Sequence, residues 1–343
     1  MMHRTPVTFV NRNGLRLIGI LEAPASPPSH DVAILLLSPG VKMRLGPECV
    51  YRRLSELFVE LGFPVLRFDF HGVGDSEGVI AEELLKDFYS RVETGRYVDD
   101  TIDAMDWLQT NHGVQRFLLA GLCGGAITGL LTGARDRRVM GLLGLGITNV
   151  VSSPNADAAR YISNGQLDRL QETYLQKVLK PSAWWRLFTF KSDYRVLWRI
   201  LLRMSKRPAQ KPSANTPAQS QIQDNSNPFF PPAFFEMLAS ERPMLLIFGG
   251  SDRLQWEFEE KFVARYRERL AQTADGYHVH TIEHANHVFT FTEWQQEMLD
   301  QSQRWLSQHF PDVVKSARPV ESSLVPGSSA ADAAHPALQS ARM

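Results

Sequence analysis

The residue whose type and neighbours point most directly to chemistry is Cys123. It stands in Gly121-Leu-Cys-Gly-Gly125, between the apolar run 117–122 and a helix-like run from 126 to 134. A G-x-C-x-G pattern between a strand and a helix is typical of a sharp, strained turn that presents one side chain at the end of a sheet. The N-terminus of a helix favours the thiolate, the nucleophilic form of cysteine. The alternative is that Cys123 is a small buried apolar side chain, as most free cysteines are.

A thiol nucleophile needs a base within hydrogen-bond distance and an acid that orients this base. Asp252 follows the apolar run 243–248, and His287 follows the run 277–282, so each is expected on a loop after a strand. In a parallel sheet these loops lie at the same edge as the turn at Cys123. For Asp252 the alternative is a turn or helix-capping role, because Gly-Gly-Ser-Asp also suits a turn.

Four histidines lie close together in this part of the sequence: His278, His280, His284 and His287. A metal site is one interpretation, but on a strand the first two share a face while the other two fall on the following loop. Neither a cysteine pair nor an H-E-x-x-H motif accompanies them, so we expect no metal and no other cofactor. His284 is the alternative base. His287 is favoured because it immediately precedes an apolar pair that leads toward the closing helix.

Acyl chemistry also requires N–H groups directed at the oxygen that becomes negative. One is expected from Gly124, directly after Cys123, and the other from Gly40 or Val41, in the loop after the apolar run 32–37. Lys42 and Arg44 follow this loop, and we interpret them as solvated charges or as contacts to an acidic part of a substrate.

The apolar runs that position these residues alternate with helical patterns, which predicts an α/β fold with a mostly parallel sheet covered on both faces. The expected strands are 7–10, 15–21, 32–37, 65–70, 117–122, 140–147, 243–248 and 277–282. The expected helices are 48–61, 97–109, 126–134, 256–270 and 294–310.

The alternation stops near residue 150, where the sequence becomes rich in Trp, Arg and Lys and then in Pro, Gln, Ser and Asn. We interpret this stretch as a helical cap followed by a mobile linker, both inserted into the sheet domain. The predicted organisation is a first core part at 1–149, the cap and linker at 150–239, a second core part at 240–310 and a disordered tail at 311–343.

Within the predicted cap, Arg195, Arg199 and Arg203 recur at four-residue spacing and would form one stripe on a helix. One interpretation is an ordinary solvated face. The other is a docking surface for an acidic partner, such as a carrier protein, a CoA-linked acyl group or an anionic lipid surface.

Composition excludes several other classes of protein. The net charge is zero, with 43% hydrophobic and 22% charged residues, so the chain as a whole has no preference for nucleic acid. Its two cysteines, Cys49 and Cys123, cannot form a disulfide framework. The N-terminus lacks a signal-peptide pattern, and the apolar stretch 183–204 is interrupted by charges that exclude a transmembrane segment. We therefore expect a cytoplasmic, reduced protein.

Three blocks of the sequence resemble one superfamily: Arg44-Leu-Gly-Pro47, Gly62-Phe-Pro-Val-Leu-Arg-Phe-Asp-Phe-His-Gly-Val-Gly-Asp-Ser-Glu-Gly78 and Gly121-Leu-Cys-Gly-Gly-Ala126. They resemble the α/β-hydrolase superfamily, in its serine aminopeptidase/monoglyceride-lipase-like branch, and are similar to a bacterial subgroup of exosortase-system-associated hydrolases with Cys in place of Ser. The likeness covers roughly residues 7 to 310.

The resemblance implies an α/β-hydrolase fold with an inserted helical cap. It also implies that Cys123, Asp252 and His287 are the catalytic triad. The departure from the wider superfamily is the cysteine nucleophile, which argues against simple lipase or peptidase activity.

A cysteine nucleophile exchanges readily with thioesters, because the bond formed resembles the bond broken. The first hypothesis is a thioesterase or carboxylesterase that acts on a small-molecule acyl substrate through an acyl-Cys123 intermediate. The second is an acyltransferase with the same intermediate. The third is a catalytically silent binding module, against which the order of Cys123, Asp252 and His287 in the chain argues.

Overall fold

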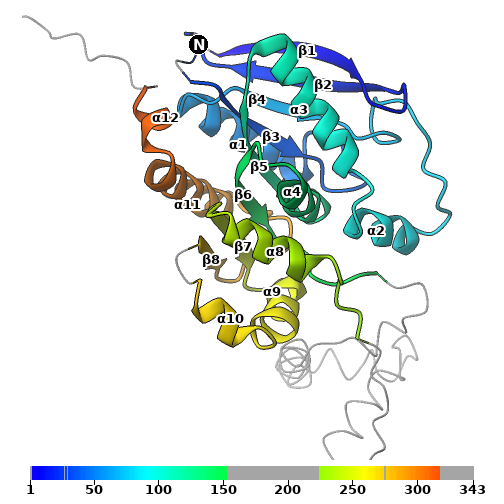
Figure 1. Ribbon diagram of the computed structural model, residues 1–343, viewed down its shortest axis with the longest axis vertical. Coiled ribbons are helices and arrows are strands. Elements are labelled where there is room, and N and C mark those ends of the chain that lie inside the picture. Colours follow the sequence, from blue (N-terminus) through cyan, green and yellow to red (C-terminus); the bar gives the residue numbers. More distant parts are fainter. Residues whose placement is uncertain (1, 27, 29, 153–223, 274–275, 317–343) are drawn as a thin grey trace, which may run out of the picture.

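The computed structural model describes residues 2–26, 28, 30–152, 224–273 and 276–316 (Figure 1). Within these residues, eight strands form one sheet in the order β1-β2-β4-β3-β5-β6-β7-β8. They are β1 (His3–Val10), β2 (Arg16–Ala23), β3 (Val32–Leu37), β4 (Val65–Phe68), β5 (Arg116–Leu122), β6 (Val139–Leu145), β7 (Met244–Gly249) and β8 (Tyr277–Ile282).

The direction of the strands confirms the mostly parallel sheet. β2 is antiparallel to β1 and β4, and all neighbouring pairs from β4 to β8 are parallel. Leu37 at the end of β3 lies opposite Gly121, and Leu122 at the end of β5 lies opposite Leu145. The loops that follow β3, β5, β6, β7 and β8 therefore meet at one edge of the sheet, which we call the carboxyl edge.

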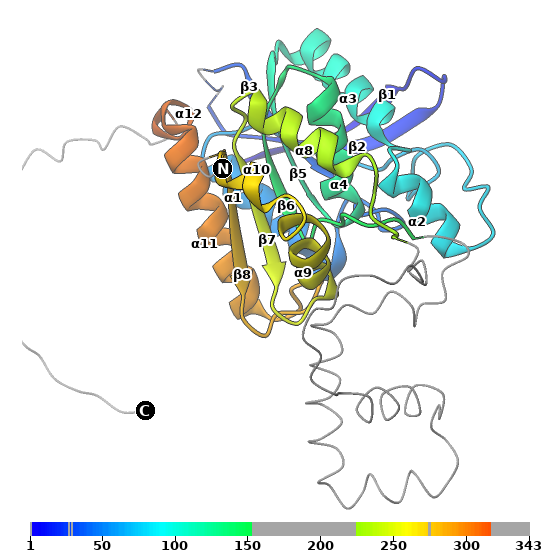
Figure 2. The same ribbon diagram turned by 60° about the horizontal axis from the view of Figure 1, so that its bottom comes forward.

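Helices cover both faces of this sheet, as predicted (Figure 2). They are α1 (Val50–Glu60), α2 (Leu85–Glu93), α3 (Val98–His112), α4 (Gly124–Arg135), α8 (Phe230–Ala239), α9 (Arg253–Phe258), α10 (Arg267–Ala271), α11 (Thr292–His309) and α12 (Pro311–Ser316). α1, α11 and α12 bury apolar side chains in the core on one face, and α2, α3, α4 and α8 do so on the other.

The central strands read as continuous apolar runs because both of their faces are buried. In β3, Leu35 and Leu37 pack into the core beneath α4, whereas Ile34 and Leu36 pack into the core beneath α1 and α11. This period of two is the geometry of any strand. The burial on both sides makes the carboxyl edge a rigid support for the loops that follow it.

The boundary predicted between cap and core at residue 239 is wrong, because α8 belongs to the core. Phe230, Phe234 and Met237 of α8 are buried in the same core as α4. Val150 and Ser226 form an isolated bridge, so the chain leaves and re-enters the core at neighbouring points. Residues 153–223, most of the predicted cap, lie outside the described residues.

The predicted disorder from residue 311 onward is wrong for 311–316. These residues form α12, whose Val313 and Val314 are buried in the core that contains α11. Their apolar contacts stabilise a turn of helix that the composition of the tail does not indicate. The remainder of the predicted tail, 317–343, lies outside the described residues.

Two helical predictions also differ from the structure. The expected helix 256–270 is divided into α9, a π-helical turn at Glu259–Val263 and α10. α2 was not predicted, although its buried Phe88 and Val92 have helical spacing. Among the described residues, no helix has the length and apolar character needed to cross a membrane.

Candidate active site

Cys123 occupies a strained turn between β5 and α4. Its backbone has φ 52° and ψ −110°, a conformation that L-residues rarely adopt, and its N–H donates to the carbonyl of Leu145 at 2.8 Å. A Cβ on Gly121 would lie 2.5 Å from the carbonyl carbon of Gly125, and a Cβ on Gly125 would lie 2.1 Å from the oxygen of Leu37. The two glycines of the motif therefore allow the strand, the turn and the helix to approach closely, as predicted.

Asp252 and His287 meet at the carboxyl edge, although they come from different loops. Asp252 follows β7 and His287 follows β8, and Nδ1 of His287 lies 2.6 Å from Oδ2 of Asp252. The other carboxylate oxygen of Asp252 accepts the N–H of Leu254 at 3.1 Å and caps α9. The two interpretations of Asp252 are therefore compatible, because the capping bond holds the carboxylate toward the histidine.

Cys123 also acts on the ring of His287, since it is one of the groups that raise the pKa of this imidazole. Burial on its own would lower the pKa of His287. The hydrogen bond to Asp252 and the charges of Cys123 and Asp252 outweigh burial and raise this pKa to about 10. The imidazole is therefore favoured in its protonated form.

The other histidines do not reach this arrangement. His284 is exposed, has a φ of 60°, and its backbone carbonyl accepts the hydroxyl of Ser251 at 3.0 Å. His280 hydrogen-bonds Glu297 of α11 at 2.7 Å. Within the described ranges, no group of three or more His, Cys, Asp or Glu side chains is arranged to hold a metal ion.

Two backbone N–H groups beside Cys123 are free to bind a negative oxygen. Those of Gly124 and Val41 have no acceptor in the part of the chain that the structure describes. The N–H of Gly40, in contrast, donates to the carbonyl of Ser38 at 2.9 Å. A Cβ on Gly124 would lie 3.3 Å from the nitrogen of Gly40, so the loop after β3 lies against the start of α4.

The sequence analysis missed Gly146, which lies beside the imidazole. A Cβ on Gly146 would lie 3.0 Å from both Cε1 and Nδ1 of His287 and 3.3 Å from Oδ2 of Asp252. Its φ is 48° and its N–H donates to Ile247 at 2.8 Å. A glycine at the end of an expected strand was the only signal in the sequence.

Tyr51 of α1 was also missed, and it fixes the strands on which the turn rests. Its buried hydroxyl donates to the carbonyl of Leu37 at 2.6 Å and accepts the N–H of Leu122 at 2.7 Å. Burial raises the pKa of Tyr51, so the hydroxyl keeps the proton that it donates to β3. One side chain thus joins the carboxyl ends of β3 and β5 next to Cys123.

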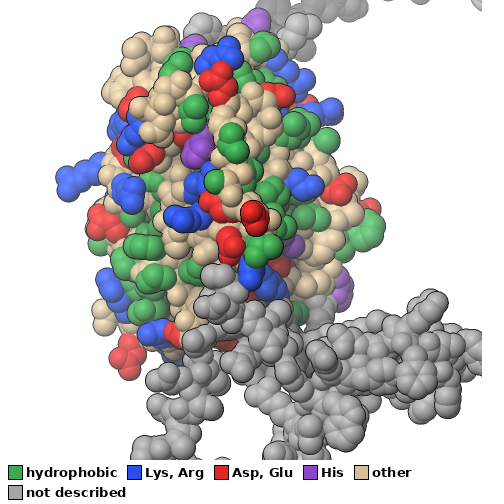
Figure 3. Space-filling view, turned by 90° about the vertical axis from the view of Figure 1, so that its right-hand side faces the viewer, with side chains coloured by type: hydrophobic (Ala, Val, Ile, Leu, Met, Phe, Trp, Pro, Cys, Tyr) green, Lys and Arg blue, Asp and Glu red, His purple; other side chains and the backbone are tan. Residues whose placement is uncertain are grey.

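The structure describes Arg44 but not the three arginines of the predicted cap. Arg44 is not a solvated charge, because its guanidinium pairs with the buried Asp69 and with Asp75 at 2.7 Å. Arg195, Arg199 and Arg203 lie outside the described residues, and their role as a docking surface stays a prediction. On the face shown in Figure 3, basic and acidic side chains are interspersed rather than gathered by sign.

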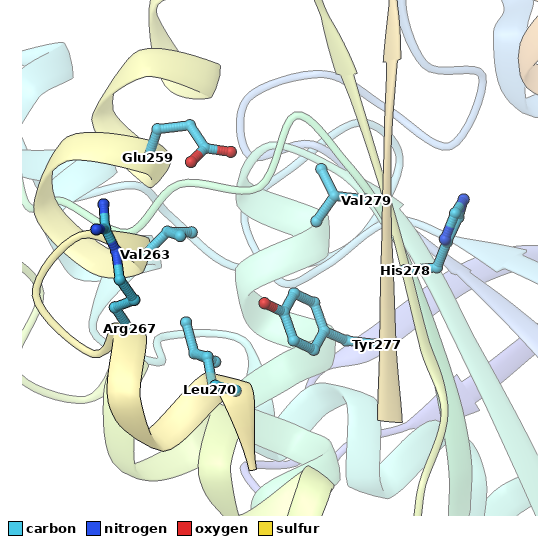
Figure 4. A pocket seen from close by; sticks show the side chains of 8 residues that line it. Glu259, Val263, Arg267, Leu270, Tyr277, His278 and Val279 are labelled. Carbon is cyan, nitrogen blue, oxygen red and sulfur yellow. The ribbon is translucent and has the colours of Figure 1, made fainter. Parts of the chain in front are cut away.

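A hollow of about 480 Å³ lies near the amino end of β8, away from Cys123. Figure 4 shows Glu259 and Tyr277 pointing into it, whereas His278 lies on the other side of the strand. Burial raises the pKa of Glu259, and burial followed by the charge of Glu259 raises that of Tyr277. The residues that line it include no cysteine or serine, so this hollow lacks the type of side chain predicted to act as the nucleophile.

Solved structures similar to this chain share its fold. Esterase Pf2001 from Pyrococcus furiosus has a TM-score of 0.55 and 14% identity, covering 90% of this chain and 93% of that chain. The hypothetical protein PA2218 from Pseudomonas aeruginosa has a TM-score of 0.53 and 18% identity, covering 90% and 94% respectively. A dienelactone hydrolase from Anabaena variabilis has a TM-score of 0.50 and 15% identity, covering 90% and 98% respectively.

No curated protein matches the sequence. A family model does, and it extends over residues 35–301. This range contains the turn at Cys123 and the loops that carry Asp252 and His287. The chain belongs to the Alpha/beta hydrolase family and is an enzyme of the hydrolase type.

Proposed function

We propose that this enzyme hydrolyses acyl esters or thioesters through a covalent acyl-Cys123 intermediate, with Cys123, His287 and Asp252 as its catalytic triad. The observation that carries the proposal is the placement of the His287 side chain, which hydrogen-bonds Asp252 at 2.6 Å and lies within electrostatic reach of Cys123. A base that contacts the nucleophile and is oriented by an acid is the arrangement that acyl transfer requires.

In the first step, the Cys123 thiolate attacks the carbonyl carbon of the substrate. The oxygen becomes negative and accepts hydrogen bonds from the N–H groups of Gly124 and Val41. When the tetrahedral intermediate collapses, the bond to the leaving alcohol or thiol breaks and His287 gives this group its proton. The acyl group remains on Cys123 as a thioester.

In the second step, His287 accepts a proton from water as the oxygen of this water attacks the acyl-Cys123 carbonyl. Collapse of the second intermediate releases a carboxylic acid and restores the thiolate beside the protonated imidazole. Asp252 keeps the ring in one orientation and stabilises its positive charge through both steps.

The class of substrate follows from the nucleophile and from the relatives. A thiolate exchanges with a thioester without a large change in bond energy, which supports thioesters beside activated esters. Two of the similar solved structures are named an esterase and a dienelactone hydrolase, which supports cleavage of an acyl–oxygen bond. We extend both bond types to this chain as part of the proposal.

The proposal is tested by turnover of p-nitrophenyl acetate and of an acetyl thioester. Cys123→Ala should lower kcat/KM about a thousandfold or more on both substrates, because the covalent route is removed. Cys123→Ser should keep weak esterase activity. Cys49→Ala is the matched control, since Cys49 is exposed and lies before α1. A Cys123→Ala enzyme that works at the wild-type rate would contradict the proposal.

The fate of the intermediate separates hydrolysis from acyl transfer. Steady turnover in water without an added nucleophile is the result expected for a hydrolase. A burst of one product equivalent, followed by a slow phase that amines or thiols accelerate, would identify an acyltransferase instead.

A further inference from the structure

α2 contacts both backbone segments that provide the free N–H groups beside Cys123. A Cβ on Gly124 would lie 2.9 Å from Cγ1 of Val92, and a Cβ on Gly40 would lie 2.9 Å from Cε1 of Tyr89. Tyr89 and Val92 are three positions apart and therefore share one face of the helix. This face of α2 lies against the place where the negative oxygen of the proposed mechanism would form.

The edge of the Tyr89 ring that faces Gly40 is the one next to its hydroxyl. Cε1 lies 2.9 Å and the ring carbon that carries the hydroxyl lies 3.6 Å from the position of a Cβ on Gly40, in the loop that continues to Val41. The side chain is half-buried, and its hydroxyl has no hydrogen-bond partner in the described ranges. It is thus an unused donor on the face of α2 that packs against Gly40 and Gly124.

Charges near Tyr89 favour its protonated form. Burial, followed by the negative charges of Cys123 and Glu93, raises the pKa of Tyr89. The hydroxyl therefore keeps its proton at neutral pH and lies within electrostatic reach of Cys123. When the thiolate attacks, its negative charge moves to the substrate oxygen, and there it would attract this proton.

The loop after β3 also provides fewer donors than the sequence suggests, because the N–H of Gly40 already donates to Ser38. We infer that the hydroxyl of Tyr89 donates a hydrogen bond to the oxyanion of the tetrahedral intermediate, together with the N–H groups of Gly124 and Val41. This inference rests on the proposed function and adds Tyr89 to its catalytic residues. No bond to Tyr89 is made or broken, and its proton stays on the hydroxyl oxygen.

Tyr89→Phe tests the inference, because it removes the hydroxyl and leaves the ring against Gly40. The measurement is the rate of acylation by p-nitrophenyl acetate, taken from the release of p-nitrophenol in a single turnover with enzyme in excess under stopped flow. The variant should acylate about a hundredfold more slowly, the loss typical of one oxyanion donor, while KM stays within about twofold. Tyr266→Phe is the matched control, a half-buried tyrosine that packs on Phe235 and Phe262.

Alkylation by iodoacetamide separates a catalytic hydroxyl from a structural one. This reaction consumes the thiolate without a tetrahedral intermediate, so Tyr89→Phe should be alkylated at the wild-type rate. Acylation at the wild-type rate, or alkylation slowed as much as acylation, would overturn the role of Tyr89. A wild-type enzyme that is not acylated at Cys123 would overturn the proposed function itself.

Discussion

Two regions of the sheet contain titratable side chains with raised pKa values, and only one has the connections that a reaction needs. At the carboxyl edge, His287 is hydrogen-bonded to the buried carboxylate of Asp252, and Cys123 helps to raise its pKa. In the hollow near the amino end of β8, the charge of Glu259 helps to raise the pKa of Tyr277, and neither side chain has a hydrogen-bond partner in the described part of the chain (Figure 4).

The difference shows that a hollow lined by side chains with raised pKa values is not by itself an active site. The proposed chemistry also requires a nucleophile, a base and an acid close together. Parallel strands can bring such groups together because loops distant in sequence, here those of Asp252 and His287, meet at their carboxyl ends. At the amino end of β8, none of the described residues that line the hollow is a nucleophile of this kind.

The largest expected effect is at His287. His287→Ala should reduce kcat/KM nearly as much as loss of Cys123, about a thousandfold, because it removes both the base and the proton donor. Asp252→Asn should retain more activity, since the thiolate does not need a base for every turnover. Steady-state kinetics of both variants on a thioester check this order, with His284→Ala as the control. If His287→Ala kept its activity and His284→Ala lost it, His284 and not His287 would be the base.

A smaller effect is expected from Gly146→Ala, which pushes a methyl group against the imidazole. We expect kcat to fall on the order of tenfold, because the ring must move away from Cys123. Gly14→Ala is a matched control for backbone strain, since Gly14 has a φ of 76° and no atom lies within 4 Å of its Cβ position. Thermal unfolding and kcat are measured for both. Equal losses of kcat in the two variants would show that the contact with His287 is unimportant.

The effect of pH on stability can be compared at two carboxyl groups, Glu93 beside the carboxyl edge and Glu259 in the hollow. Burial raises the pKa of Glu93 to about 7. Hydrogen bonds from the N–H of Ser152 at 2.6 Å and from its hydroxyl at 3.0 Å lower this pKa, but burial outweighs them. Because the unfolded value is 4.5, the folded protein is penalised increasingly as the pH rises from about 4.5 to about 7.

Above pH 7, Glu93→Gln should therefore raise the free energy of unfolding on the order of 2 kcal/mol, and the Tm with it. Near pH 4.5, the substitution should have little effect on either. An amide fits this place, since its oxygen can accept the N–H of Ser152 and its nitrogen can donate to the hydroxyl. Glu259→Gln should give a smaller difference, because Glu259 is exposed. Scanning calorimetry from pH 4.5 to 8 measures both. A Tm difference for Glu93→Gln that does not change with pH would refute the assignment.

The smallest effect is expected in the hollow itself. Glu259→Gln and Tyr277→Phe should leave kcat/KM within about twofold on ester and thioester, because neither side chain is connected to Cys123. Steady-state kinetics with the wild-type enzyme in parallel give the comparison. A tenfold loss of activity in either variant would mean that the two regions act together.

The sequence predicted the sheet and the turn at Cys123 because both depend on local patterns. Continuous apolar runs mark strands buried on both faces, and the glycines around Cys123 mark a turn where backbone segments approach closely. The meeting of Asp252 with His287 was also predicted, since parallel strands place their following loops at one edge.

The remaining features depend on contacts between distant segments. Nothing near Phe230 shows that α8 packs on α4, so its apolar side chains were assigned to the cap. The short α12 is helical because Val313 and Val314 contact the core beneath α11. Tyr89 and Gly146 lack any motif, and their positions beside Cys123 and His287 follow only from the packing of α2 and the end of β6.

The measurement that tests the account most directly is the intact mass of the enzyme after rapid mixing with p-nitrophenyl acetate and an acid quench. We predict one added acetyl group on the wild-type chain, located by peptide mapping to Cys123, and none on Cys123→Ala. The adduct should disappear as turnover is completed. An acetyl group on another residue, or the same adduct on Cys123→Ala, would contradict the account.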